Sequence, residues 1–167
     1  TLVGGTAMGG NAGTGGNGGR GGSGNGGNIH QLGGNLRLEH TILDDGVLQA
    51  GFGSEGQPGG TIAFPDISSP GVQSDGYNLV NFRGPTTGWV ASDLPNGTEP
   101  LLGPLDFYGG TVEGFLPLDG SPARNGGAPG TCSATEDQNG IPRPQQAACD
   151  VGALEFRGDN VFADGFE

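Results

Sequence analysis

Alternation of apolar and polar residues is clearest in the stretch NLRLEHTIL, residues 35–43. Leu36 and Leu38 point to one side of an extended chain, whereas Arg37 and Glu39 point to the other. Short runs of the same type, bounded by Gly, Pro, Asn and Asp, occur at 61–64 (TIAF), 77–80 (YNLV) and 111–118 (TVEGFLPL). No stretch shows helical periodicity. The pattern predicts short β-strands.

A recurring four-residue unit precedes three of these runs. It consists of two glycines, a polar residue and an aliphatic residue, and it begins at Gly33, Gly59 and Gly109. The intervals are close to one and two steps of about 25 residues, in the range that is typical of stacked repeats. The strands are therefore expected to stack in parallel as successive turns of a solenoid, with these side chains inward: Leu36, Leu38, Ile62 and Leu79. A glycine-rich chain also produces such units by coincidence, so this alternative stays open.

Composition supports an all-β chain. Among 167 residues there are 39 glycines and 12 prolines, and 32% are hydrophobic, which is too few for a helical bundle or a doubly wound sheet. This length suits one domain or one end of a larger one. We expect a turn-rich, all-β solenoid.

Charge excludes several classes of partner. Six arginines and eighteen acidic residues, with no lysine, give a net charge of -12. Nucleic acids and anionic membrane surfaces require clustered positive charge, so we expect neither as a partner. No apolar run approaches the roughly 18 residues of a transmembrane segment. The surplus of acidic groups favours a soluble extracellular protein.

Two cysteines, Cys132 and Cys149, lie in a segment rich in proline and glycine. A zinc site would need a second cysteine pair or histidines, and this segment has neither. A disulfide is therefore expected, in an oxidising compartment. The chain begins at Thr1 rather than methionine, which we interpret as a processed product or a piece of a longer precursor.

Several separated motifs in the second half resemble a known family. They are the Gly-Ser-Pro-Ala element at 120–123, the Asp-Gln-x-Gly-x-x-Arg-Pro element at 137–144 and the Cys-Asp-aliphatic-Gly-Ala-x-Glu element at 149–155. In this order they resemble the C-terminal region of bacterial right-handed parallel β-helix surface proteins of the choice-of-anchor Q type. The resemblance spans roughly residues 29–156. It implies a β-helix and a surface location, and it implies no reaction.

The resemblance also implies a structural charge cluster closing a C-terminal cap, made of Asp137, Arg143, Asp150 and Glu155. The final residues 159–167 resemble a short tail of secreted proteobacterial proteins. No cofactor is expected; the tail acids Asp159, Asp164 and Glu167 are a weak signal for calcium, since they lack the alternating spacing of a calcium loop.

The glycine run at residues 9–28 matches the dinucleotide fingerprint on paper, but it lacks the flanking strand and helix that the fingerprint needs. Its larger polar residues recur every third position, at 11, 14, 17, 20 and 23, as they would along one edge of a polyproline-II-like chain. We expect 9–23 to be extended and packed closely on other backbone, either of its own fold or of neighbouring copies. The expected packing glycines are Gly10, Gly13, Gly16, Gly19 and Gly22.

Few residues suggest catalysis. Asp44 and Asp45 are adjacent acids, which fit a turn at the end of a strand or the acidic cluster of a polysaccharide-cleaving β-helix. Arg37 or Arg83 would have to supply its basic group. His30 and His40 lie ten residues apart without a zinc motif, so we expect ordinary histidines.

The sequence thus predicts four segments: a glycine-rich extended segment (1–28), β-helix turns (29–118), a disulfide-closed cap (119–156) and a tail (157–167). The function expected is that of an extracellular structural or surface protein, in adhesion or in a self-assembled filament or layer. Its partners would be copies of itself, a polysaccharide or a host or abiotic surface. The alternative is a module that binds or cleaves polysaccharide.

Overall fold

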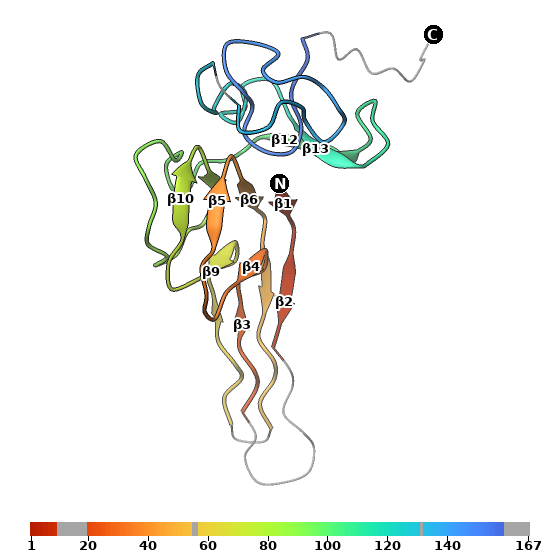
Figure 1. The fold of residues 1–167 in the computed structure, drawn as a ribbon. Coiled ribbons are helices and arrows are strands. Elements are labelled where there is room, and N and C mark those ends of the chain that lie inside the picture. Colours follow the sequence, from red (N-terminus) through yellow and green to blue (C-terminus); the bar gives the residue numbers. More distant parts are fainter. Residues whose placement is uncertain (10–19, 55–56, 131, 159–167) are drawn as a thin grey trace, which may run out of the picture.

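The computed structural model describes residues 1–9, 20–54, 57–130 and 132–158. Within these ranges the chain forms short β-strands and no α-helix, which confirms the all-β class. A central body of strands carries a long arm at one end and a loop-rich region, formed by the second half of the chain, at the other (Figure 1). No helix in the described ranges could cross a membrane.

The strands are two to five residues long. They are β1 (Leu2–Val3), β2 (Thr6–Met8), β3 (Gly24–Asn25), β4 (Ile29–His30), β5 (Arg37–Glu39), β6 (Ile42–Asp44), β7 (Val47–Gln49), β8 (Ile62–Ala63), β9 (Ile67–Ser68), β10 (Gln73–Gly76), β11 (Leu79–Val80), β12 (Leu102–Asp106) and β13 (Gly114–Pro117).

Strands β1 to β11 pair in parallel. One sheet has the order β1-β6-β11, and the remaining pairs are β2 with β7, β3 with β8, β4 with β9 and β5 with β10. Partners lie 36 to 41 residues apart in the sequence, as in Arg37 with Gln73 and Leu2 with Leu43. Strands β1 to β4 are therefore followed along the chain, in the same order, by their partners β6 to β9.

The expected spacing of about 25 residues is wrong. Strand β8 pairs with β3, so Ile62 lies beside Gly24 and not beside β5, which follows Leu36. The predicted inward position of Ile62 is wrong too, because its side chain is 59% exposed. The first two passages through the body each include a long excursion into the glycine-rich arm, and this excursion lengthens the interval between paired strands.

The other predicted strands lie where the pattern placed them. Residues 35–43 contain β5 and most of β6, separated by a corner at His40, whose φ is 46°. Leu38 and Leu79 are buried, and Leu36 is half-buried against the core. These segments pair in parallel with β10 and β11 rather than forming hairpins.

The core consists of two clusters on opposite sides of the β1-β6-β11 sheet. Leu43 belongs to the first, with Leu38, Ile67 and Val80, and the adjacent Ile42 belongs to the second. Successive residues of a strand face opposite sides, which explains this division. The second cluster includes Ala123 and Val151, so it joins the body to the second half of the chain.

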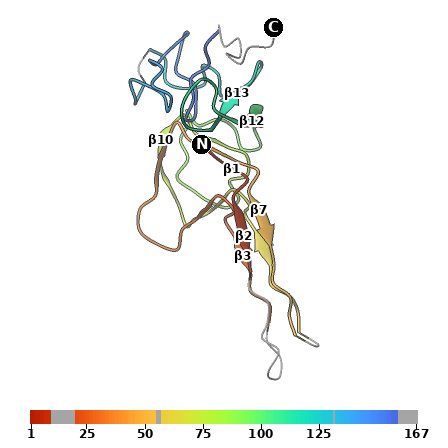
Figure 2. The ribbon, with the colours of Figure 1, turned by 90° about the vertical axis from the view of Figure 1, so that its right-hand side faces the viewer.

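The second half is mainly irregular. Strands β12 and β13 form an antiparallel pair, shown in Figure 2 beside the cap, which is the region of residues 119–156. Within the cap Cys132 and Cys149 form the predicted disulfide, with their Cα atoms 5.8 Å apart.

Replacing Cys132 and Cys149 by serine should lower the free energy of unfolding by about 3 kcal/mol, because the unfolded chain loses a closed loop of this length. The bond joins positions 17 residues apart, and Cys149 is buried. Urea unfolding followed by the fluorescence of Trp89 measures the change. A double variant as stable as the parent would contradict the expectation, and reduction of the parent should reproduce the loss.

Candidate functional site

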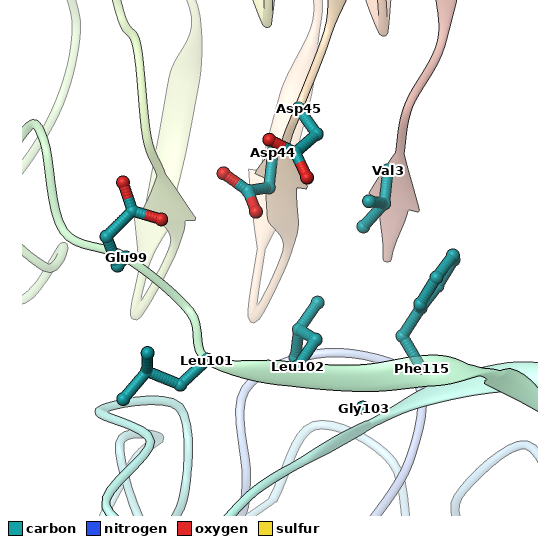
Figure 3. Close-up of a pocket in the computed structure, with 8 residues that line it drawn as sticks. All are labelled: Val3, Asp44, Asp45, Glu99, Leu101, Leu102, Gly103 and Phe115. Carbon is teal, nitrogen blue, oxygen red and sulfur yellow. The ribbon is translucent and has the colours of Figure 1, made fainter.

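A pocket of about 250 Å³ lies between the body and the β12-β13 pair. Figure 3 shows Asp44 and Asp45 at the end of β6 and Val3 on β1 facing Leu101, Leu102 and Phe115 across it. Glu99 and Gly103 complete the lining. The pocket thus combines three carboxylates with apolar side chains.

Asp44 is the most enclosed acid of this pocket, with 6% of the residue exposed. The side-chain amide of Asn81 donates to Asp44 Oδ1 at 2.8 Å and to Glu99 Oε1 at 3.0 Å, so one amide bridges two carboxylates. Burial raises the pKa of Asp44, and the neighbouring charges of Asp45 and Glu99 add to this effect. The pocket can therefore hold one carboxyl that protonates more readily than an ordinary aspartate.

The chain does not turn at Asp44 and Asp45 as predicted, because neither a turn nor a bend interrupts its passage from β6 to β7. Strand β6 ends at Asp44, and Asp45 takes a left-handed conformation with φ 51° ahead of Gly46. Aspartate tolerates this conformation better than most residues. The two adjacent acids thus lie where β6 ends and form part of the pocket wall.

The basic candidates do not line this pocket. Arg37 pairs with Asp75 on the neighbouring strand, at an exposed position. The guanidinium of Arg83 lies 4.4 Å from the ring centre of Trp89 and donates to the carbonyl of Leu94. The side chains that line the pocket include no arginine or histidine, and the sequence hypothesis of an arginine beside Asp44 and Asp45 is wrong in this respect.

The two histidines differ. His30 is exposed at the end of β4, whereas the ring of His40 stacks on Tyr77 with centroids 5.2 Å apart. His40 Nε2 accepts a hydrogen bond from the backbone N–H of Ala128 at 3.1 Å. Burial lowers the pKa of His40, which suits an acceptor nitrogen. His40 therefore connects the body to the cap.

The four predicted cap residues lie together. Arg143 donates to the carbonyls of Asp150 and Gly152, and its Nε lies 3.6 Å from Glu155 Oε2. Glu155 accepts from the backbone of Asp150, and Asp137 accepts from the backbone of Glu155 at 2.8 Å. These contacts hold the loops of the cap in place.

Another group of polar residues joins the layers of the body. Asp66 is buried and accepts hydrogen bonds from the backbone of Gly46 and Phe82 and from the side chain of Asn28. Asn28 also donates to the carbonyl of Asp44 at 2.8 Å. One buried carboxylate thus satisfies donors from three separate passages of the chain.

Side chains next to the ends of paired strands form hydrogen-bonded pairs. Ser23 lies 3.0 Å from Thr61, the hydroxyl of Ser69 donates to Gln31, and Asn28 donates to Asp66, in each case across 38 residues of sequence. Sequence reasoning missed this interval. A signal was available, because Asn28-Ile29 and Asp66-Ile67 are similar dipeptides at this spacing, and so are Ile42-Leu43 and Leu79-Val80 at 37.

Four of the five predicted packing glycines, Gly10, Gly13, Gly16 and Gly19, lie outside the described residues, as do the tail acids Asp159, Asp164 and Glu167. Gly22 is described, and its carbonyl accepts from the backbone N–H of Gly51 at 2.9 Å. A Cβ atom at Gly9 or Gly60 would overlap this same carbonyl. At Gly22, close packing therefore occurs within the chain.

Among the described residues, no group of three or more His, Cys, Asp or Glu side chains could hold a metal ion.

Comparison with known proteins found no matching family model, no matching curated protein and no matching solved structure.

Lowering the pH from 7 towards the ordinary carboxyl pKa of about 4 should raise the thermal unfolding midpoint. Burial raises the pKa of Asp44, Asp66, Asp150 and Glu155, so the folded chain retains protons that the unfolded chain releases. This stabilisation is complete below the ordinary carboxyl pKa and is lost as the pH rises through the raised values. The lowered pKa of His40 acts in the opposite direction below about pH 6.5.

Scanning calorimetry at a series of pH values measures this dependence. The Asp44→Asn variant should show a smaller rise, because it lacks one of the four carboxyls. A midpoint that falls steadily from pH 7 to pH 5 in the parent would contradict the expectation.

Proposed function

We propose that this protein is an extracellular structural component of a bacterial surface, built as a short right-handed parallel β-helix and working in adhesion or in a self-assembled layer. The parallel order β1-β6-β11 and the pairs that accompany it support a helix in which each turn lies on the one before. The right-handed sense is the one that nearly all parallel crossover connections take.

The hydrogen-bonded pairs of polar side chains between stacked segments are the observation that carries this proposal. The side chain of Ser23 is hydrogen-bonded to that of Thr61, and the side chain of Ser69 to that of Gln31, between chain segments that stack on one another. Such pairs stabilise stacked strands. These pairs contribute to the stiffness of the stacked strands and not to a reaction.

Two further features favour an extracellular location. The disulfide between Cys132 and Cys149 is typical of an oxidising compartment. The net charge of -12 keeps a protein soluble without a partner. The order of motifs in residues 120–155, which resembles the choice-of-anchor Q type, supports a bacterial surface.

Adsorption of the purified full chain to silica, to a hydrocarbon-coated surface and to immobilised polysaccharide, on a quartz crystal microbalance, tests this proposal. We expect a rigid layer on at least one surface and no release of sugar from the polysaccharide. Failure to adsorb to any of them, or cleavage of the polysaccharide, would refute it.

A second function is favoured by the acidic pocket. Enzymes that cleave glycosidic bonds use two carboxyl groups, one of which has a raised pKa. Asp44 has this property and lies beside Asp45 and Glu99. If the chain releases reducing ends from a polysaccharide, Asp44→Asn should abolish the release, whereas the exposed Asp106→Asn should not.

A further inference from the structure

His40 lies where the body meets the cap. Figure 1 shows the corner between β5 and β6, which His40 forms, at the end of the body that faces the cap. The backbone N–H of His40 donates to the carbonyl of Gly76 at 3.2 Å, and the ring stacks on Tyr77. The left-handed φ of 46° is a conformation that histidine adopts more readily than most residues. These contacts fix the ring from the side of the body.

Two segments of the cap contact the same residue. The backbone N–H of Gly152 donates to the carbonyl of His40 at 2.8 Å, and the backbone N–H of Ala128 donates to His40 Nε2 at 3.1 Å. The disulfide between Cys132 and Cys149 joins these two segments to each other. The side chain of His40 is therefore enclosed between body and cap, with 8% of its surface exposed.

The hydrogen bond from Ala128 requires one protonation state of the ring. Nε2 accepts only while it carries no proton, so the neutral ring holds its proton on Nδ1. Nδ1 lies 3.4 Å from Ser133 Oγ and 3.8 Å from Glu39 Oε1, which are both oxygens that can accept. A second proton, on Nε2, would place two donors 3.1 Å apart. The contact with Ala128 is lost in that state.

The ring has little room to avoid this conflict. A Cβ atom at Gly127 would lie 2.8 Å from both Cδ2 and Nε2 of His40, so the cap backbone is already close to the ring. Elsewhere the cap is held by apolar packing, since Ala123 and Val151 belong to the second core cluster. That packing does not titrate. Protonation therefore acts on the segment around Ala128 and leaves the rest of the cap attached.

The surroundings of His40 set the pH at which this happens. Burial lowers the pKa of His40, Glu39 on β5 offsets part of this effect, and Arg143 in the cap adds to the lowering. Tyr77 is the titratable group that stacks on the ring. The ring is thus neutral at pH 7 and gains its second proton below the ordinary value of about 6.5. The stabilisation from the Ala128 contact is complete above that ordinary value and is lost as the pH falls through the lowered pKa.

We propose that His40 makes the attachment of the cap sensitive to pH: in acidic surroundings Nε2 gains a proton from the solvent, and the segment around Ala128 separates from the body. The device depends on one nitrogen that accepts from the cap only while the ring is neutral. This inference goes beyond the proposed function and does not rest on it.

Nuclear magnetic resonance of the full chain, titrated from pH 7 to about pH 4, tests the inference. We expect the ring of His40 to titrate below its ordinary value and the amide resonance of Ala128 to move with the same midpoint. The protection of the Ala128 amide against hydrogen exchange, relative to an unstructured peptide at the same pH, should fall at least about fivefold. A ring that titrates without any change at Ala128 would overturn the inference.

His40→Gln is the variant that separates His40 from the carboxyls that also titrate in this range. Glutamine keeps an acceptor oxygen but gains no proton, so the Ala128 amide should stay protected down to about pH 4. His30→Gln, at the exposed end of β4, is the matched control and should behave as the parent. Equal loss of protection in His40→Gln and the parent would refute the role of His40.

A second variant keeps the test valid if His40→Gln does not fold, as judged by its unfolding transition. Glu39→Gln removes the charge that favours protonation of His40, at a side chain that is 43% exposed. The midpoints of His40 and Ala128 should then move together to lower pH. An Ala128 midpoint that stays in place while that of His40 moves would contradict the proposal.

Discussion

Replacing Asn78 by leucine should lower the free energy of unfolding by about 4 kcal/mol, since it leaves buried polar groups without partners. Asn78 has no exposed surface. Its amide oxygen accepts from the backbone of Thr41 at 2.9 Å, and its amide nitrogen lies within hydrogen-bond distance of Leu38 O, Ser74 Oγ and Asp93 Oδ1. Leucine has nearly the same size, so the loss reflects hydrogen bonding rather than a cavity.

The carboxylate of Asp93 should carry much of this effect. Burial alone would raise the pKa of Asp93, but hydrogen bonds from Val90, Ser74 and Asn78 outweigh it and lower the pKa. The parent therefore loses this contribution only as the pH falls through the lowered value. Removing Asn78 leaves a buried charge with fewer donors.

Urea unfolding followed by Trp89 fluorescence measures the change at neutral pH. Asn35→Leu, at an exposed position ahead of β5, is the control and should change stability by less than about 0.5 kcal/mol. Equal effects of the two variants would show that the buried network adds nothing specific.

Replacing Gly46 by valine should cost about 4 kcal/mol, more than the usual overpacked core, because the atoms that it meets belong to the main chain. A Cβ atom at Gly46 would overlap the carbonyl group of Pro65 and lie 3.0 Å from the backbone nitrogen of Asp66. The backbone N–H of Gly46 also donates to Asp66 Oδ1 at 2.9 Å. Separating these segments would therefore disturb the carboxylate that joins three passages of the chain.

Gly33→Val is the matched control, since no atom lies within 4 Å of a Cβ at that position and its backbone is not left-handed. We expect little change from it. Thermal unfolding of both variants measures the difference. A Gly46→Val protein within about 1 kcal/mol of the parent would show that the Pro65 segment moves aside at little cost.

The class of the fold and the position of several strands could be predicted because they depend on local pattern. Alternation around Leu38 places its side chain on the buried side of β5, as found. The disulfide followed from an absence of other partners for Cys132 and Cys149 in the sequence, and the structure contains it. Neither prediction required knowledge of how distant segments meet.

The pairing of strands could not be predicted in this way. The two-glycine units suggested an interval of about 25 residues, whereas Ile29 lies beside Ile67, and Ile62 faces outward beside Gly24. The interval depends on how many residues each passage spends in the glycine-rich arm. Alternation of apolar and polar residues indicates that a segment is a strand, but it is the same whichever strand lies beside that segment.

The candidate pocket, likewise, could be predicted only in part from the sequence. Asp44 and Asp45 attract notice as neighbours in the sequence, but Glu99 and Asn81 join them only through the fold. Likewise, the sequence by itself determined that the chain is all-β, acidic and closed by a disulfide, since these properties follow from residue types and short intervals. Only the tertiary structure decided that glycines line the inside of the arm while Val47 and Met8 lie outside. Because a glycine has no side chain, the spacing of glycines in the sequence does not show which segment packs against them.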